Sequence, residues 1–444
     1  MSRTTSILAR LRRYESRNVT FVDPAGAWPI VWSRARGTRV WDAEGREFLD
    51  LTAAFGVCAA GHANPRVVRA GQRQLARLPH AMGDVHPHPL KAELAEALSR
   101  LTFERWRGTS RGKVIFCNSG FEAVEAGLKT ALLATGKPGV VAFQGAYHGL
   151  GYGALTTTHR EHFRRPFRAQ LARFARFVPF PTKASDETRV ARQVEELLRG
   201  GRCGAVLVEP LQARGGMRIP PPRFLPALRR LCTRHGALLI VDEIFTGFGR
   251  TGAWFGCEHT STVPDVICLG KALTGGFPLS ACVGRAELMD AAWPEATGEA
   301  IHTSTFLGHP VGCAMALAQV EEIRRRRLVE RSAELGAVFL QRLQEELRGV
   351  SCGEVRLRGQ GLMVALELLD PAGRPATSVA LACVKRLLQL GVLVLPEGEA
   401  GNVLAITPPL VITHREVQQA ARALAQALSE TAAVQAARGR ERTP

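Results

Sequence analysis

Short runs of apolar residues recur through the middle of the chain, and segments with helical spacing of apolar positions lie between them. Helical spacing marks residues 122–133 and 224–234. A strand that is covered on both faces is apolar throughout, and its alternation with helices predicts an α/β fold with a mainly parallel sheet between helical layers. The apolar runs cover residues 114–117, 140–143, 205–208, 238–241, 266–269 and 279–283.

The two ends of the chain show other patterns. Residues 38–42 and 47–51 alternate and are joined by a glycine turn, which predicts a hairpin. The segments with helical spacing are 66–78, 90–101, 313–327, 333–347 and 381–390, and predicted strands cover 362–367 and 392–395. We expect an N-terminal segment of a small lobe (1–60), a large domain (61–309), a C-terminal α/β lobe (310–430) and a mobile tail (431–444).

Composition narrows the class of protein. The chain is 46% hydrophobic and 22% charged, which suits a large globular core. No run reaches the roughly 18 to 20 apolar residues of a membrane-spanning helix, and no secretory leader is evident at the N-terminus. Ten cysteines without paired spacing predict reduced core residues and no metal site. We therefore expect a cytoplasmic protein without membrane contact.

The formal net charge of +18 would suit a protein that binds polyanions. The arginines are, however, spread over the whole length, so nucleic-acid binding is not the expected function. Local runs at 324–327 and 438–442 are typical of solvated surface.

One lysine stands out against this arginine-rich background. Only seven of the 58 basic residues are lysines, and Lys271 directly follows the apolar run 266–269 and Gly270. An amine, unlike a guanidinium, can lose its proton and form a Schiff base with a carbonyl compound. Taken alone, the segment also fits a solvated loop lysine.

Polar residues follow the other predicted strands as well. Ser119, Gly120 and Phe121 begin a helix, where free backbone N–H groups could bind a phosphate, although Asn-Ser-Gly is also an ordinary helix cap. Tyr147, beside glycines, could stack on a planar ring or pack on the core. Asp242 ends a buried strand, and its carboxylate needs a partner such as a protonated ring nitrogen.

Taken together, these motifs resemble the class III pyridoxal-phosphate aminotransferases of fold type I. The resemblance covers residues from about 20 to 428 and is carried by 118–125 (Asn-Ser-Gly-Phe-Glu-Ala-Val-Glu), 147–149 (Tyr-His-Gly), 209–212 (Glu-Pro-Leu-Gln), 242–252 (Asp-Glu-Ile-Phe-Thr-Gly-Phe-Gly-Arg-Thr-Gly), 270–276 (Gly-Lys-Ala-Leu-Thr-Gly-Gly) and 303–310 (Thr-Ser-Thr-Phe-Leu-Gly-His-Pro).

The resemblance implies pyridoxal 5′-phosphate as cofactor and transfer of an amino group from an amine or ω-amino acid to a keto acid. Lys271 would form the Schiff base and Asp242 would pair with the pyridinium nitrogen, making these two residues catalytic. The other implied cofactor-binding residues are Ser119, Gly120, Phe121, Tyr147, His148, Glu209, Gln212 and, from the partner subunit of a homodimer with shared active sites, Thr305. An aminomutase or a decarboxylase on the same scaffold is the alternative, and a basic binding protein without catalysis is a weaker one.

The sequence departs from the family at three informative places. Phe245 stands where a glutamine often contacts the ring hydroxyl, so Gln212 could supply that contact. Arg214 occupies the place of a glutamate, and Ala405 the place of the arginine that pairs with it. We therefore expect an unpaired Arg214 to bind the substrate carboxylate, with Phe55 as an apolar wall. The alternative is a solvated Arg214 and an uncharged amine as substrate.

Overall fold

The computed structural model describes residues 2–440 except 24–27, 108–109 and 351–352, and residues 441–444 lie outside the description. Its largest sheet has seven strands. Strand β10 runs antiparallel to both of its neighbours, and the other four neighbouring pairs are parallel. This confirms the predicted mainly parallel α/β sheet. In spatial order the strands are β4 (Gly112–Cys117), β10 (Ser280–Arg285), β9 (Val266–Leu269), β8 (Leu238–Asp242), β7 (Cys203–Val208), β5 (Gly139–Phe143) and β6 (Ala175–Val178).

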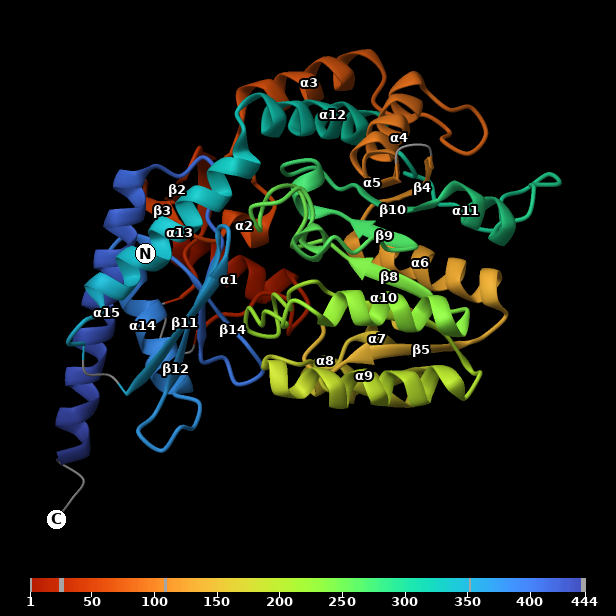
Figure 1. Cartoon of the computed structure of the whole chain (residues 1–444). Coiled ribbons are helices and arrows are strands. Elements are labelled where there is room, and N and C mark those ends of the chain that lie inside the picture. Colours follow the sequence, from red (N-terminus) through yellow and green to blue (C-terminus); the bar gives the residue numbers. More distant parts are fainter. Residues whose placement is uncertain (1, 24–27, 108–109, 351–352, 441–444) are drawn as a thin grey trace.

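Helices cover both faces of this sheet (Figure 1). Alternate residues of the strands contribute to two separate apolar clusters, one shared with α6 (Gly120–Thr135) and the other with α9 (Ala184–Arg199) and α10 (Phe224–His235). Strands β7, β8 and β9 are buried at every residue, which is why their sequences are continuously apolar.

Two four-stranded sheets form the rest of the core. The predicted hairpin is confirmed, because β2 (Arg39–Asp42) pairs with β3 (Glu47–Asp50). The predicted strand at 392–395 is wrong as a single element, because β13 (Val392–Leu393) pairs with β3 while β14 (Leu395–Glu397) joins the other sheet. The remaining strands are β1 (Trp32–Arg36) beside β2, and β11 (Glu354–Gln360), β12 (Met363–Leu369) and β15 (Val403–Ile406) beside β14.

The pairing of β3 with β13 joins the two ends of the chain, which supports a small lobe built from 1–60 and 310–430; those boundaries stay predictions. Figure 1 shows this lobe on the left. Residues 431–440 of the predicted tail are helical, because α15 (His414–Arg440) extends to Arg440 and buries Thr431; the mobility of the tail stays a prediction, and 441–444 lie outside the described residues. The other helices of the lobe are α1 (Arg3–Tyr14), α13 (Leu328–Glu346) and α14 (Thr377–Gln389). The chain also forms α2 (Ala53–Gly56), α4 (Pro89–Leu101), α5 (Phe103–Arg107), α7 (Tyr152–Thr157), α8 (Glu161–Arg164) and α11 (Ala286–Ala292).

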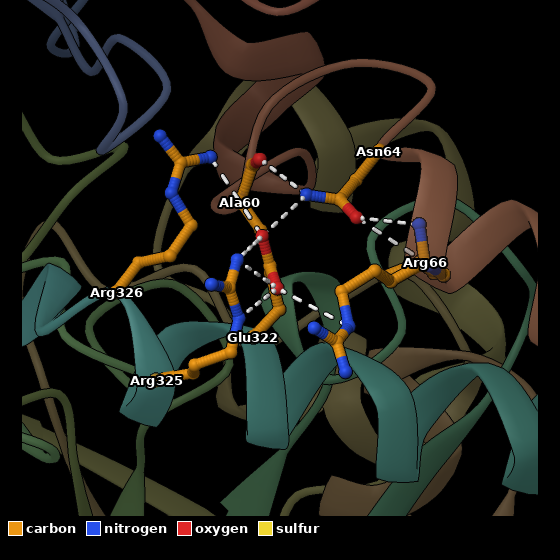
Figure 2. Close-up of polar contacts among 7 residues, drawn as sticks. Ala60, Asn64, Arg66, Glu322, Arg325 and Arg326 are labelled. Carbon is orange, nitrogen blue, oxygen red and sulfur yellow. Dashed lines mark hydrogen bonds and ion pairs between the residues drawn. The ribbon is translucent and has the colours of Figure 1, made fainter.

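Helices α3 (Pro65–Arg77) and α12 (Pro310–Arg325) are joined through a buried carboxylate, that of Glu322 (Figure 2). It accepts hydrogen bonds from Asn64 at 3.3 Å and from Arg325 at 3.0 Å, and Arg66 and Arg326 lie 3.8 Å away. Part of the arginine run at 324–327 therefore neutralises an interior acid.

Candidate active site

A cavity of about 380 Å³ opens where strands β5, β7, β8 and β9 end. Ligands of open parallel sheets bind at this edge, so its position agrees with the strand-end residues singled out in the sequence. The cavity is lined by Gly120, Phe121, Tyr147, His148, Gly149, Leu150, Glu209, Ala213, Arg214, Asp242, Ile244, Phe245, Thr246 and Lys271.

The amine of Lys271 is held inside this cavity. The residue follows β9 after Gly270 and has a left-handed backbone with φ of 43°. Its Nζ lies 3.8 Å from the centre of the Phe245 ring. Burial lowers the pKa of the Lys271 amine to about 8, although the nearby Asp242 carboxylate opposes that effect. The amine is therefore easier to deprotonate than that of a surface lysine.

Asp242 and His148 form a buried pair behind the lysine. The Asp242 Oδ2 and His148 Nδ1 atoms are 2.8 Å apart, and Asp242 Oδ1 accepts the N–H of Ile244 at 3.1 Å. The other ring nitrogen of His148 is buried without a hydrogen-bond partner among the described residues. The pair orients the carboxylate, because the histidine fixes one oxygen and the backbone the other.

A second buried carboxylate, Glu209, ties two neighbouring loops together. It accepts the N–H groups of Tyr147 at 3.1 Å and Ala213 at 3.2 Å. Burial raises the pKa of Glu209 to about 7, while the His148 ring opposes the rise. Tyr147 is thereby fixed at the cavity wall.

The start of α6 lies at the cavity, where the sequence predicts an anion site. Glu122 accepts the N–H groups of Asn118 at 2.6 Å and Ser119 at 3.0 Å, and the N–H groups of Glu122 and Ala123 donate to the Ser119 carbonyl at 3.1 and 3.4 Å. The N–H groups of Gly120 and Phe121 have no partner within the helix. The buried hydroxyl of Ser119 has no partner among the described residues. Gly120 and Phe121 line the cavity, whereas Ser119 lies just behind them.

Besides Ser119, three predicted residues do not line the cavity of their own chain. Gln212 donates its side-chain N–H to the Gln144 carbonyl at 2.9 Å, while its Oε1 is buried without a partner among the described residues, and its contact with a ligand stays a prediction. Phe55 is half-exposed and Thr305 is exposed, and neither lines the cavity. A role for these two residues would require a second subunit.

The expectation of an unpaired Arg214 is wrong. Its Nε lies 3.4 Å from Oε2 of Glu397, which is almost fully buried on β14, and its guanidinium lies 4.8 Å from the Tyr147 ring centre. Arg214 does line the cavity, as predicted. No sequence signal pointed to Glu397, because the two residues meet only through the packing of distant loops, where the Gly398 N–H donates to the Arg214 carbonyl at 3.2 Å.

The described residues include no group of three or more His, Cys, Asp or Glu side chains suited to a metal ion. None of their helices combines the length and apolar character that crossing a membrane requires. The nine described cysteines are buried, and none of them forms a disulfide with another described residue.

Comparison with known proteins agrees with this geometry. The model of the family Aminotransferase class-III matches residues 22–428. The chain is 38% identical to the acetylornithine aminotransferase of Methanosarcina acetivorans, over 90% of this chain and 92% of that protein. It is 34% identical to the 5-aminovalerate aminotransferase of Pseudomonas aeruginosa, over 97% and 100% of the two chains. A crystal structure of a Bacillus anthracis aminotransferase superposes with a TM-score of 0.87 at 27% identity, over 96% and 98% of the chains. The resemblance in the sequence is thereby confirmed, and the chain belongs to the class III aminotransferase family.

Proposed function

We propose that this aminotransferase uses pyridoxal 5′-phosphate and holds it covalently through a Schiff base to Lys271. The cofactor's ring supplies an electron sink for the bonds at the amine-bearing carbon of the substrate. The observation that carries the proposal is a lysine amine of lowered pKa and a buried, oriented carboxylate in one cavity at the ends of the strands.

The described residues fit the parts of this cofactor. The start of α6 and the unpartnered Ser119 hydroxyl suit a phosphate, and the Tyr147 ring suits the face of a planar heterocycle. Asp242, held by His148, suits a protonated ring nitrogen because an adjacent negative charge favours the charged form. With the cofactor bound, the Lys271 amine would be the base that moves the proton at the reacting carbon of the substrate.

We further propose an amine or ω-amino acid as donor and a keto acid as acceptor. The names of the relatives support this choice, because acetylornithine, 5-aminovalerate and putrescine all carry an amine on a terminal carbon. A homodimer with shared sites is part of the proposal, supported by Thr305, which is exposed and does not line the cavity of its own chain. The cytoplasmic location stays a prediction.

The absorption spectrum of the purified protein tests the cofactor directly. We expect a yellow chromophore that bleaches when 5-aminovalerate, putrescine or N-acetylornithine is added, and that returns with a keto acid. Equal yields of the aminated acceptor and the oxidised donor, without release of carbon dioxide, separate transamination from decarboxylation or mutase chemistry. A colourless protein that gains no chromophore from added pyridoxal 5′-phosphate would overturn the proposal.

A further inference from the structure

Three charged residues lie close together beside the cavity, which Arg214 lines, and we name Arg160, Arg214 and Glu397 the charged rim. Arg160 precedes α8, Arg214 follows β7, and Glu397 ends β14. Cations and aromatic rings alternate here. The Arg160 guanidinium lies 5.3 Å from the Phe163 ring centre, and that of Arg214 lies 6.0 Å from Phe163 and 4.8 Å from Tyr147. The Phe163 ring, which both cations contact, holds the Arg160 guanidinium beside that of Arg214, and Arg214 lines the cavity.

The charges of the rim do not balance. Glu397 is the nearest acid to Arg214, and Arg160 forms no ion pair within 4.0 Å with any carboxylate that the structure describes. Arg160 is nevertheless half-buried, and burial, followed by the neighbouring Arg214, lowers its pKa. Burial raises the pKa of Glu397 while both arginines oppose that effect. Glu399 also acts on Arg160 but is exposed to solvent, where water screens its charge.

Two guanidinium groups beside one buried carboxylate leave one positive charge to be satisfied by a ligand. We propose that Arg160 and Arg214 together form a subsite for the substrate carboxylate remote from the reacting amine, and that Glu397 competes with that carboxylate for Arg214. This inference rests on the proposed function, because it concerns the end of the substrate that is remote from the reacting amine. The subsite selects ω-amino acids over amines of the same chain length. Arg160 contributes to this selectivity as much as Arg214 does.

A matched pair of donors separates carboxylate recognition from chemistry. 5-Aminovalerate and pentylamine share the amine and the chain length and differ in the terminal carboxylate. Bleaching of the cofactor-loaded enzyme by each donor, without any keto acid, gives two half-saturation concentrations. The selectivity ratio is the value for pentylamine divided by the value for 5-aminovalerate. A charge-assisted hydrogen bond predicts that Arg160→Ala and Arg214→Ala each reduce this ratio at least about tenfold. Glu397→Gln should increase it, because the competing charge is gone.

A second measurement needs no turnover. Calorimetric titration with valerate, which has the carboxylate and lacks the amine, should show weaker binding to Arg160→Ala and tighter binding to Glu397→Gln. Arg160→Lys keeps the charge and should retain most of the selectivity. The control is Arg168→Ala, since this exposed arginine pairs with Glu161 outside the rim and should leave both donors unaffected.

The outcomes are distinct. An unchanged ratio in Arg160→Ala, or a lower ratio in Glu397→Gln, would overturn the carboxylate subsite while leaving the aminotransferase assignment intact. Failure of every amine to bleach the wild-type enzyme would instead remove the proposed function. Unfolding temperatures and the absorbance of the bound cofactor, measured for each variant, identify any that has lost its fold.

Discussion

Lys271 adopts a backbone conformation that residues other than glycine rarely use, and it does so at the one position where the chemistry needs a fixed amine. A left-handed residue of this kind costs on the order of 1–3 kcal/mol and persists only where the surrounding packing fixes it. Here Ala272 and Leu273 are buried directly after it, and β9 is buried before it. The strained turn aims the side chain into the cavity rather than along the sheet.

Replacing Lys271 with alanine should abolish amino transfer and leave the fold intact. The core around the lysine comes from β9 and from Ala272 and Leu273, whose packing does not depend on the amine. Steady-state turnover and thermal unfolding of Lys271→Ala measure the two effects separately. Lys113→Ala is a suitable control, because this exposed lysine pairs with Asp290 at the far end of β4. Substantial turnover by Lys271→Ala would contradict the assigned role.

The lowered pKa of Lys271 predicts how cofactor capture depends on pH. Only the unprotonated amine attacks an aldehyde, so the rate at which the apoprotein captures pyridoxal 5′-phosphate should rise with pH and level off above about 8. An ordinary lysine, with a pKa of about 10.4, would still gain rate well above that value. Absorbance after mixing apoprotein with cofactor, from pH 6 to 10, gives the profile. A rate that keeps rising to pH 10 would contradict the lowered pKa.

Asp242 should matter more for rate than for stability. Asp242→Ala removes the charge expected beside the ring nitrogen, so kcat should fall by orders of magnitude. It also leaves His148 Nδ1 buried without its partner, which should cost about 1–3 kcal/mol of the free energy of unfolding. Asp242→Asn keeps the shape of the side chain and isolates the charge. Near wild-type kcat in both variants would mean that the carboxylate is only structural.

At the scale of elements, the sequence was most informative where a strand is covered on both faces. Strands β7, β8 and β9 were predictable because every residue is buried. Edge strand β6 was not predicted, because only Val178 of its four residues is buried and its apolar run is broken by the exposed Arg176. The change of sheet at Val394 could not be predicted either, since both halves of that run are apolar.

The same contrast holds for the candidate site. Residues that directly follow buried strands, such as Asp242 and Lys271, could be placed together because parallel strands end at one edge. Glu397 could not, because it lies on the other lobe's sheet and meets Arg214 only through loop packing.

The carboxylate that joins α3 and α12 should contribute measurably to stability. Glu322→Ala removes charged hydrogen bonds to Asn64 and Arg325, and we expect it to lower the free energy of unfolding by about 1.5–3 kcal/mol. Its neighbour Glu321 is exposed and pairs only with Arg324, so Glu321→Ala should change stability by less than about 0.5 kcal/mol. Denaturant unfolding of the two variants makes the comparison. Equal effects would show that the interior cluster in Figure 2 adds nothing beyond a surface ion pair.

At the scale of the whole molecule, apolar and aromatic side chains lie where two loops meet near the start of α6. The ring of His80 lies 5.3 Å from that of exposed Phe306, and His88 Nε2 lies 2.7 Å from the Gly308 carbonyl oxygen. Met82 and Val85 are also more than half exposed. Exposed apolar clusters of this kind commonly mark subunit interfaces, which supports the proposed homodimer.

Complementation between two inactive variants tests whether the sites are shared. If Thr305 reaches the phosphate in its partner's site, Thr305→Asp should impair both sites of its own homodimer, because the new carboxylate repels the phosphate. Lys271→Ala is inactive for a separate reason. A hybrid dimer of the two variants would combine both changes in one site and leave the other site with an intact Lys271 and an intact partner Thr305.

Co-expression of the variants with different affinity tags isolates that hybrid, and we expect it to regain activity that neither parent homodimer has. If Thr305 served the cavity of its own subunit, each site of the hybrid would still carry one defect and no activity would return. Absence of recovery in a hybrid that sedimentation shows to be a dimer would therefore contradict the shared site. A monomer in sedimentation would contradict the dimer itself, and the exposed Phe306 would then need another partner.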